Sequence, residues 1–172
     1  MTGRAVEELK AAIRDVPDFP KPGVLFRDIS PLLKSHFAAT IEALDDLLTE
    51  AEWRGIDVVA GIESRGFILG AALALRRGKG FVLVRKQGKL PPPVVDVSYA
   101  LEYGSGVLEM QRGQGSVILI DDVLATGGTL SASADLCLRA GYSVAALAVL
   151  IDLKLVVDYR WRELPLRTAI SY

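Results

Sequence analysis

Residues 117–122, which read VILIDD, place two adjacent acids directly after an apolar run. The four apolar residues predict a short buried strand, so Asp121 and Asp122 are expected to follow its end. Nothing in the packing of a strand requires two acids at this place. Paired carboxylates can accept hydrogen bonds from neighbouring hydroxyls of a sugar. The pair therefore predicts a site that binds a sugar.

The loop after the acids suits a phosphate group. A helix is predicted over 130–140, with Gly141 at its end, and the residues before it are small or carry hydroxyls. Glycines let backbone N–H groups approach a phosphate closely, and the helix dipole favours its negative charge. No Lys follows the glycines, which excludes the P-loop of nucleoside-triphosphate-binding proteins. The candidate phosphate ligands are Ala125, Thr126, Gly127, Gly128 and Thr129.

A second loop has groups that suit a diphosphate. Glu63, Ser64 and Arg65 lie between two glycines, after a predicted strand at 56–60 and at the start of a predicted helix at 66–77. Backbone N–H groups and an arginine that can bind two oxygens at once would hold such an anion. The alternative is an ordinary strand-to-helix turn with a surface arginine.

A basic segment follows the next predicted strand, at 81–84. Arg85, Lys86 and Lys89 put three cations into five residues. Cations at the end of a strand suit a leaving diphosphate, which carries several negative charges. A solvated basic turn remains the alternative.

Two further segments have side chains that suit a flat heterocycle. In SYALEYG, residues 98–104, Glu102 can transfer a proton to or from a bound base. In DFPKPGVLFRDI, residues 18–29, an aromatic face can stack on a ring while the rigid backbone beside it reads the ring edge. The alternatives are a hairpin tip with a solvated acid and a hydrophobic loop that packs the N-terminal helix onto the core.

Alternating helices and strands would position these segments. Helical spacing predicts helices over 4–15, 37–51, 66–77 and 130–140, and apolar runs predict strands over 56–60, 81–84, 117–120, 144–151 and 166–171. Residues 94–99 and 107–110 alternate in polarity and predict a hairpin, whereas three prolines exclude regular structure through 17–23. This order predicts an α/β fold with a parallel sheet, whose ligands lie at the carboxyl ends of the strands.

Composition limits the class of protein. The 172 residues, 51% hydrophobic, suffice for one domain with a single core. A net charge of −1 gives no field that recruits nucleic acid or a membrane. The N-terminus shows no signal peptide and the longest apolar run is too short to cross a bilayer, so a cytoplasmic protein is expected. Cys137 is expected in the core, and His36, the one histidine, at a helix start without a transition-metal site.

Residues 120–130 resemble the phosphoribosyl-diphosphate (PRPP) binding motif of the type I phosphoribosyltransferases. Further segments match in order along the chain, at 17–33, 61–70, 84–91 and 98–104. The first and last of these are more specific than the PRPP motif and are similar to the members that act on adenine. The last twenty residues match nothing of use.

The resemblance implies a type I phosphoribosyltransferase fold, with a central, mostly parallel sheet flanked by helices. It implies one domain, residues 1–172, in which about residues 1–35 contribute a small N-terminal hood that binds the base. Residues from about 89 to 108 would form a flexible lid loop. A homodimer is also implied.

The implied reaction joins adenine to PRPP and gives AMP and diphosphate, a step of purine salvage that uses Mg²⁺. Since Mg²⁺ is held mainly by substrate oxygens and water, no direct protein ligand is expected. Asp121 and Asp122 would hold the ribose hydroxyls, and residues 125–129 the 5-phosphate. The implied diphosphate ligands are Glu63, Ser64, Arg65, Arg85, Lys86 and Lys89, with some of the last three from a partner subunit and a cis peptide at Glu63–Ser64.

The resemblance also implies how the base is bound. Phe26 would stack on adenine, and backbone groups of Leu25 and Arg27 would read its edge. Glu102 would handle the base proton and Tyr103 would seal the site, so that Glu102, Arg65 and Tyr103 form the expected catalytic set.

Three other functions fit parts of the pattern. A type I transferase for xanthine, hypoxanthine or guanine would share the PRPP site but need a different base-reading segment. A regulator that senses PRPP without catalysis would need a nucleic-acid-binding module or a basic face. A generic nucleotide-binding domain would need a G-x-G-x-x-G loop, which follows no predicted strand.

Overall fold

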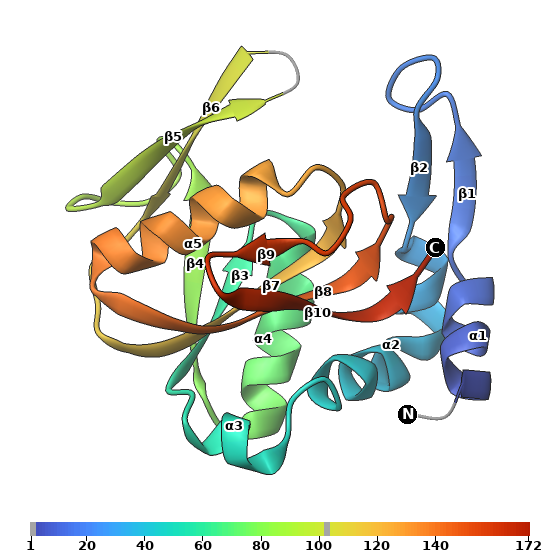
Figure 1. Cartoon of the computed structure of the whole chain (residues 1–172), viewed down its shortest axis with the longest axis horizontal. Helices are drawn as coiled ribbons and strands as arrows, with labels where there is room; N and C mark the ends of the chain where they lie inside the picture. Colours follow the sequence, from blue (N-terminus) through green and yellow to red (C-terminus); the bar gives the residue numbers. More distant parts are fainter. Residues whose placement is uncertain (1–2, 102–103) are drawn as a thin grey trace.

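An eight-stranded sheet forms the centre of the computed structural model, which describes residues 3–101 and 104–172. Its order is β5-β6-β4-β3-β7-β8-β10-β9 (Figure 1). The five inner strands are parallel, namely β4 (Gly80–Lys86), β3 (Val58–Ile62), β7 (Gly115–Leu124), β8 (Tyr142–Asp152) and β10 (Leu164–Ser171). The antiparallel edges are β5 (Val95–Leu101) with β6 (Gly104–Met110), and β9 (Arg160–Trp161). The predicted α/β fold with a mostly parallel sheet is confirmed.

Helices cover both faces of the sheet because the buried strands alternate their side chains between two cores. On β7, Ile118 and Ile120 pack with the helices α2 (Ser30–Asp45) and α4 (Arg65–Arg77). Val117 and Leu119 pack on the other face with α5 (Gly128–Ala140), whose Cys137 is buried as expected. No helix in the described part of the chain is long and apolar enough to cross a membrane.

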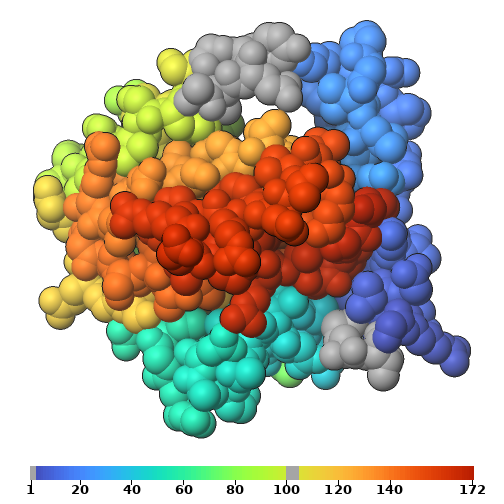
Figure 2. Space-filling view, viewed as in Figure 1, coloured from blue at the N-terminus to red at the C-terminus, as the bar shows by residue number. Residues whose placement is uncertain are grey.

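The N-terminal segment comprises α1 (Gly3–Ala11), whose Leu9 joins the main core, followed by β1 (Arg14–Pro17) and β2 (Leu25–Asp28). The two strands pair antiparallel with each other and project beside the main sheet, in blue in Figures 1 and 2. The helix predicted over 4–15 is therefore too long, because the chain turns through Ile13 into β1. Prolines keep the connection 18–24 out of the ladder, yet the residues on both sides of it pair.

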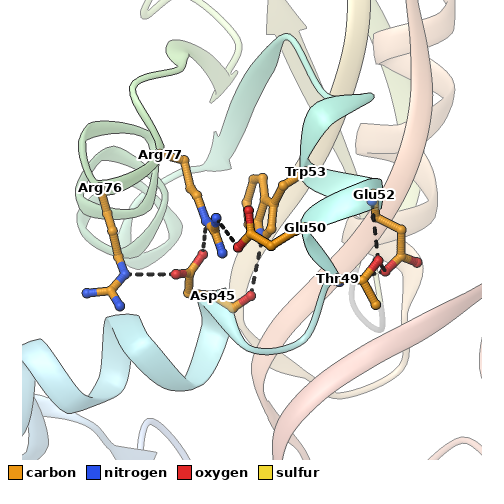
Figure 3. A network of polar contacts seen from close by, with 7 residues as sticks. All are labelled: Asp45, Thr49, Glu50, Glu52, Trp53, Arg76 and Arg77. Atoms are coloured by element: carbon orange, nitrogen blue, oxygen red, sulfur yellow. Dashed lines mark hydrogen bonds and ion pairs between the residues drawn. The ribbon is translucent and has the colours of Figure 1, made fainter.

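The helix predicted over 37–51 is wrong at both ends. Helix α2 starts earlier, at Ser30, with a proline in its first turn, where a missing N–H costs nothing. A new helix, α3 (Glu50–Arg54), begins after Thr49, which forms a capping box with Glu52 (Figure 3). His36 lies at a kink in α2 with non-helical angles, φ −133° and ψ 28°, where two helical segments join, so it precedes the start of the second segment as expected.

The strands are longer than predicted, because neighbouring strands pair beyond the apolar runs. Strand β7 continues to Leu124, which pairs with Asp152 of β8. Asp121 and Asp122 thus lie inside β7 rather than after it. The predicted hairpin is confirmed as β5 and β6, whose register runs from Val95 with Met110 to Leu101 with Gly104. Glu102 and Tyr103 fall outside the described residues.

Candidate active site

A cleft of about 490 Å³ opens at the carboxyl ends of the parallel strands. It brings together the loop after β3, the end of β4, the end of β7 and the start of α5. Strands β5 and β6 add Tyr99 and Leu108 to its wall. The sequence-predicted residues that line it are Glu63, Ser64, Arg65, Lys86, Asp121, Asp122, Ala125, Thr126, Gly127, Gly128 and Thr129.

The two acids of β7 lie in unlike surroundings. Asp122 is 5% exposed, and its Oδ2 lies 2.7 Å from Nε of Arg65 as an ion pair. That oxygen has no hydrogen-bond partner among the described residues. Burial raises the pKa of Asp122, and the charge of Arg65 opposes this rise. The ion pair therefore lies at the cleft, and the oxygen in it accepts no hydrogen bond among the described residues.

Asp121 accepts a hydrogen bond from the backbone N–H of Asp122 at 2.9 Å. Burial, and then the negative charge of Asp122, raise the pKa of Asp121 well above its ordinary value. The carboxyl lies against Gly66 at the start of α4. A Cβ on Gly66 would come within 2.7 Å of the carbonyl oxygen of Ile120, so only glycine allows α4 to approach β7 so closely.

The start of α5 forms an anion-binding end of the cleft. Gly127 has a φ of +82° and turns the chain into α5 without a side-chain cap. The first helical bond here runs from the N–H of Ser131 to the carbonyl of Gly127, at 2.9 Å. The N–H groups of the first turn precede that bond and have no intrahelical acceptor. Together with the hydroxyls of Thr126 and Thr129 they suit a phosphate.

Glu63 ties the β3 loop to the end of β4. Its carboxylate accepts from Nε of Arg85 and from the N–H of Lys86, both at 3.1 Å. Burial opposes the charge of Glu63, but these bonds prevail and its pKa is lowered. The expected cis peptide at Glu63–Ser64 is present. Of the three predicted cations, Lys86 lines the cleft, whereas Arg85 and Lys89 do not.

The predicted base-binding residues lie on β2, outside the lining of this cleft. The ring of Phe26 faces the guanidinium of Arg65, 4.9 Å from its centroid, and meets the edge of Phe19 at 5.2 Å. Leu25 is exposed. The side chain of Arg27 pairs with Asp15 and covers the ring of Tyr172 at 3.8 Å. Arg65 therefore joins the acid pair to the aromatic side chain of β2.

Comparison with known proteins decides the family. Residues 33–163 match the phosphoribosyl transferase domain. An adenine phosphoribosyltransferase of Bdellovibrio bacteriovorus is 51% identical over 165 residues, which cover 96% of this chain and 99% of that protein. The chain belongs to the adenine phosphoribosyltransferase family.

Solved adenine phosphoribosyltransferases share the whole architecture. The enzyme of Rhodothermus marinus superposes with a TM-score of 0.87 at 43% identity, covering 99% of this chain and all of that one. The enzyme of Saccharomyces cerevisiae, a complex with an imino-altritol bisphosphate and adenine, gives 0.88 at 35% identity, covering 98% and 100%. The resemblance inferred from the motifs, and the type I phosphoribosyltransferase fold that it implied, are confirmed.

Sequence analysis missed two supports of the adenine phosphoribosyltransferase site. Tyr159 packs under the phosphate loop, where a Cβ on Gly127 would lie 2.3 Å from its ring. Its hydroxyl lies 2.8 Å from Oγ of Ser131 and donates to the carbonyl of Gly127 at 3.4 Å. No pattern in the sequence near Tyr159 predicted this contact.

The second missed residue is Glu109, a buried acid on β6 that accepts three backbone hydrogen bonds. The sequence carried no signal for its burial, since Leu108 and Met110 point to the opposite face of the strand and an alternating pattern predicts an exposed acid between them. A buried carboxylate of this kind needs several donors.

Proposed function

We propose that this protein transfers the 5-phosphoribosyl group from PRPP to adenine, which yields AMP and diphosphate. The observation that carries the proposal is the cleft in which buried Asp122 and its neighbour Asp121 face the free N–H groups of α5. A sugar phosphate would use both ends of this cleft, with its hydroxyls at the two acids and its phosphate at the start of α5. Membership of the adenine phosphoribosyltransferase family supports adenine as the acceptor.

The 5-phosphate would bind the N–H groups and hydroxyls of residues 125–129, where the helix N-terminus favours its charge. The ribose hydroxyls would donate to Asp121 and Asp122. The Oδ2 of Asp122 supports this assignment, because it is ion-paired with Arg65 but accepts no hydrogen bond among the described residues, and a ribose hydroxyl could donate to it.

Arg65, Lys86 and the backbone at Glu63 and Ser64 would hold the diphosphate. Positive groups placed where the leaving group gains charge lower the barrier for departure. Arg85 binds Glu63 and would act within its own subunit by fixing this loop. Lys89 would act from a partner subunit, which accords with its position outside the cleft lining.

The base would lie between β2 and the cleft. Phe26 would stack on adenine, and backbone groups of Leu25 and Arg27 would read its exocyclic amine and ring nitrogen. The position of Phe26 beside Arg65 supports this role. The yeast relative binds adenine in its crystal structure, which supports the same ligand here. Glu102 would exchange the base proton and Tyr103 would exclude water during transfer.

Mg²⁺ would enter as the partner of the substrate. The described residues contain no group of three His, Cys, Asp or Glu side chains that could hold a metal ion. The site residues fit an ion held by phosphate oxygens and water, since Asp121 and Asp122 line the cleft and could accept hydrogen bonds from water bound to such an ion. When bound, the ion would neutralise charge on the diphosphate.

The larger organisation belongs to the same proposal. Residues 1–172 would act as one domain in a cytoplasmic homodimer, with about 1–35 as the base-binding hood. Residues 89–108 would form the lid, and most of this segment is the β5–β6 hairpin.

Diphosphate release with PRPP, Mg²⁺ and one base at a time tests the proposal. We expect release with adenine and no release above background with hypoxanthine, guanine or xanthine. Release with a 6-oxopurine would retain the PRPP site and overturn the role of residues 25–27. PRPP binding without release from any base would overturn catalysis and favour a regulator.

A further inference from the structure

Glu109 of β6 is a buried acid whose partners are all in one turn. Its side chain is 3% exposed. One oxygen accepts the N–H of Gly88 at 3.0 Å, and the other accepts those of Lys89 at 2.7 Å and Leu90 at 2.6 Å. The carboxylate thus fills a concavity formed by three successive backbone N–H groups.

The geometry of the turn explains why a charged acid is stable there. Gly88 has a φ of +78°, and a left-handed residue within such a turn directs successive N–H groups toward one point. Burial opposes the charge of Glu109, but the three bonds and the nearby Arg85 prevail and lower its pKa. Glu109 therefore remains ionised at neutral pH, where charge-assisted bonds are strong.

The turn held by Glu109 adjoins the two lysines that are proposed to bind diphosphate. Lys86, which lines the cleft, precedes it, and Lys89 lies within it. The carbonyl of Lys89 accepts from Arg85 at 3.0 Å, and Arg85 binds Glu63 of the β3 loop. In the β4–β6 ladder Arg85 lies opposite Glu109. The chain of contacts therefore runs from Glu109 through the turn to the loop that bears Ser64 and Arg65.

We propose that Glu109 is a positioning residue for diphosphate recognition, which sets the place of Lys86 and Lys89 by holding the turn 86–90 against β6. The inference rests on the proposed function. Glu109 itself does not line the cleft, so it acts through the turn.

The test compares Glu109→Gln with Asp96→Asn as the matched control. Asp96 lies opposite Glu109 in the β5–β6 register but is exposed. Glutamine keeps the size of the side chain, loses its charge and turns an N–H₂ group toward backbone donors. We expect the KM for PRPP and the Kd for diphosphate to rise about tenfold in Glu109→Gln, with the KM for adenine within about twofold of wild type. Asp96→Asn should match wild type in all three.

A merely structural role would give a different result. Equal rises in both KM values, or a lower melting temperature with unchanged KM values, would overturn the inference. Glu109→Asp keeps the charge and should recover part of the affinity for PRPP. It also serves if the glutamine variant fails to fold, since a KM for adenine that rises as much as the KM for PRPP in Glu109→Asp would then overturn the inference. Absence of turnover by the wild type would instead reject the proposed function.

Discussion

Tyr159 shows how a single side chain outside the cleft can shape the phosphate loop. Its ring occupies the space beside Gly127, and its hydroxyl bonds to Ser131 in the first turn of α5. Tyr159→Phe keeps the ring and removes the bond. Loss of one such hydrogen bond costs about 1 kcal/mol, so we expect the KM for PRPP to rise about fivefold with little change in kcat.

Steady-state kinetics with PRPP varied at saturating adenine measure this effect. Ser131→Ala removes the other partner of the same bond and should raise the KM for PRPP by a similar factor. If both variants keep the wild-type KM, packing of the ring alone supports the loop.

At the scale of elements, Asp45 connects three helices (Figure 3). Its buried carboxylate, at the end of α2, binds Nε of Arg76 at 2.8 Å and also Arg77, both from the last turn of α4. Its carbonyl accepts from the indole of Trp53 in α3, at 3.1 Å. The network therefore fixes the C-terminal end of α4, about 18 Å from the end that bears Arg65.

Asp45→Asn should lower the free energy of unfolding by about 2 kcal/mol. A fully buried pair would cost more, but the guanidinium of Arg76 is partly exposed and can regain water. Urea unfolding measures the loss, and the KM values for adenine and PRPP should stay at wild type. Glu50→Gln removes an exposed partner of Arg77 and should cost under about 0.5 kcal/mol. Loss of activity in a fully stable Asp45→Asn would contradict this account.

Periodicity predicted the inner strands and the helices α4 and α5, because apolar residues there meet the core at regular spacing. It misjudged α2 and α3, since the capping bonds of Thr49 interrupt a continuous apolar stripe. Periodicity also missed β2, because this strand is defined by its pairing with β1, about ten residues earlier in the chain. Strand ends were set too early because β8 extends the ladder of β7 past the apolar run.

At the scale of the whole molecule, the cleft depends on contacts between distant segments. The motifs located the ribose, phosphate and diphosphate groups, because each motif is local. The motif residues predicted neither the contact of Arg65 with Phe26 nor that of Tyr159 with Gly127, since each joins segments more than thirty residues apart. The same assembly places partly buried Asp121 beside buried Asp122, and this has a consequence for stability.

The charge of Asp121, which is proposed to bind ribose, is expected to lower the free energy of unfolding. Because its pKa is raised in the folded protein, the folded state binds the proton more tightly than the unfolded chain does. Stability is therefore lost as pH rises from the unfolded pKa, about 3.9, through the folded pKa. Asp121→Asn removes the charge, and its side-chain oxygen can still accept the N–H of Asp122.

We expect Asp121→Asn to be about 1 kcal/mol more stable than wild type at pH 8, while its KM for PRPP rises about tenfold. The gain should vanish below about pH 4, where the wild-type carboxyl is protonated in both states. Urea unfolding at pH 3 and pH 8 measures the difference. A variant less stable than wild type at both pH values would show that the charge of Asp121 stabilises the fold. Binding of ribose by Asp121 would then carry no cost in stability.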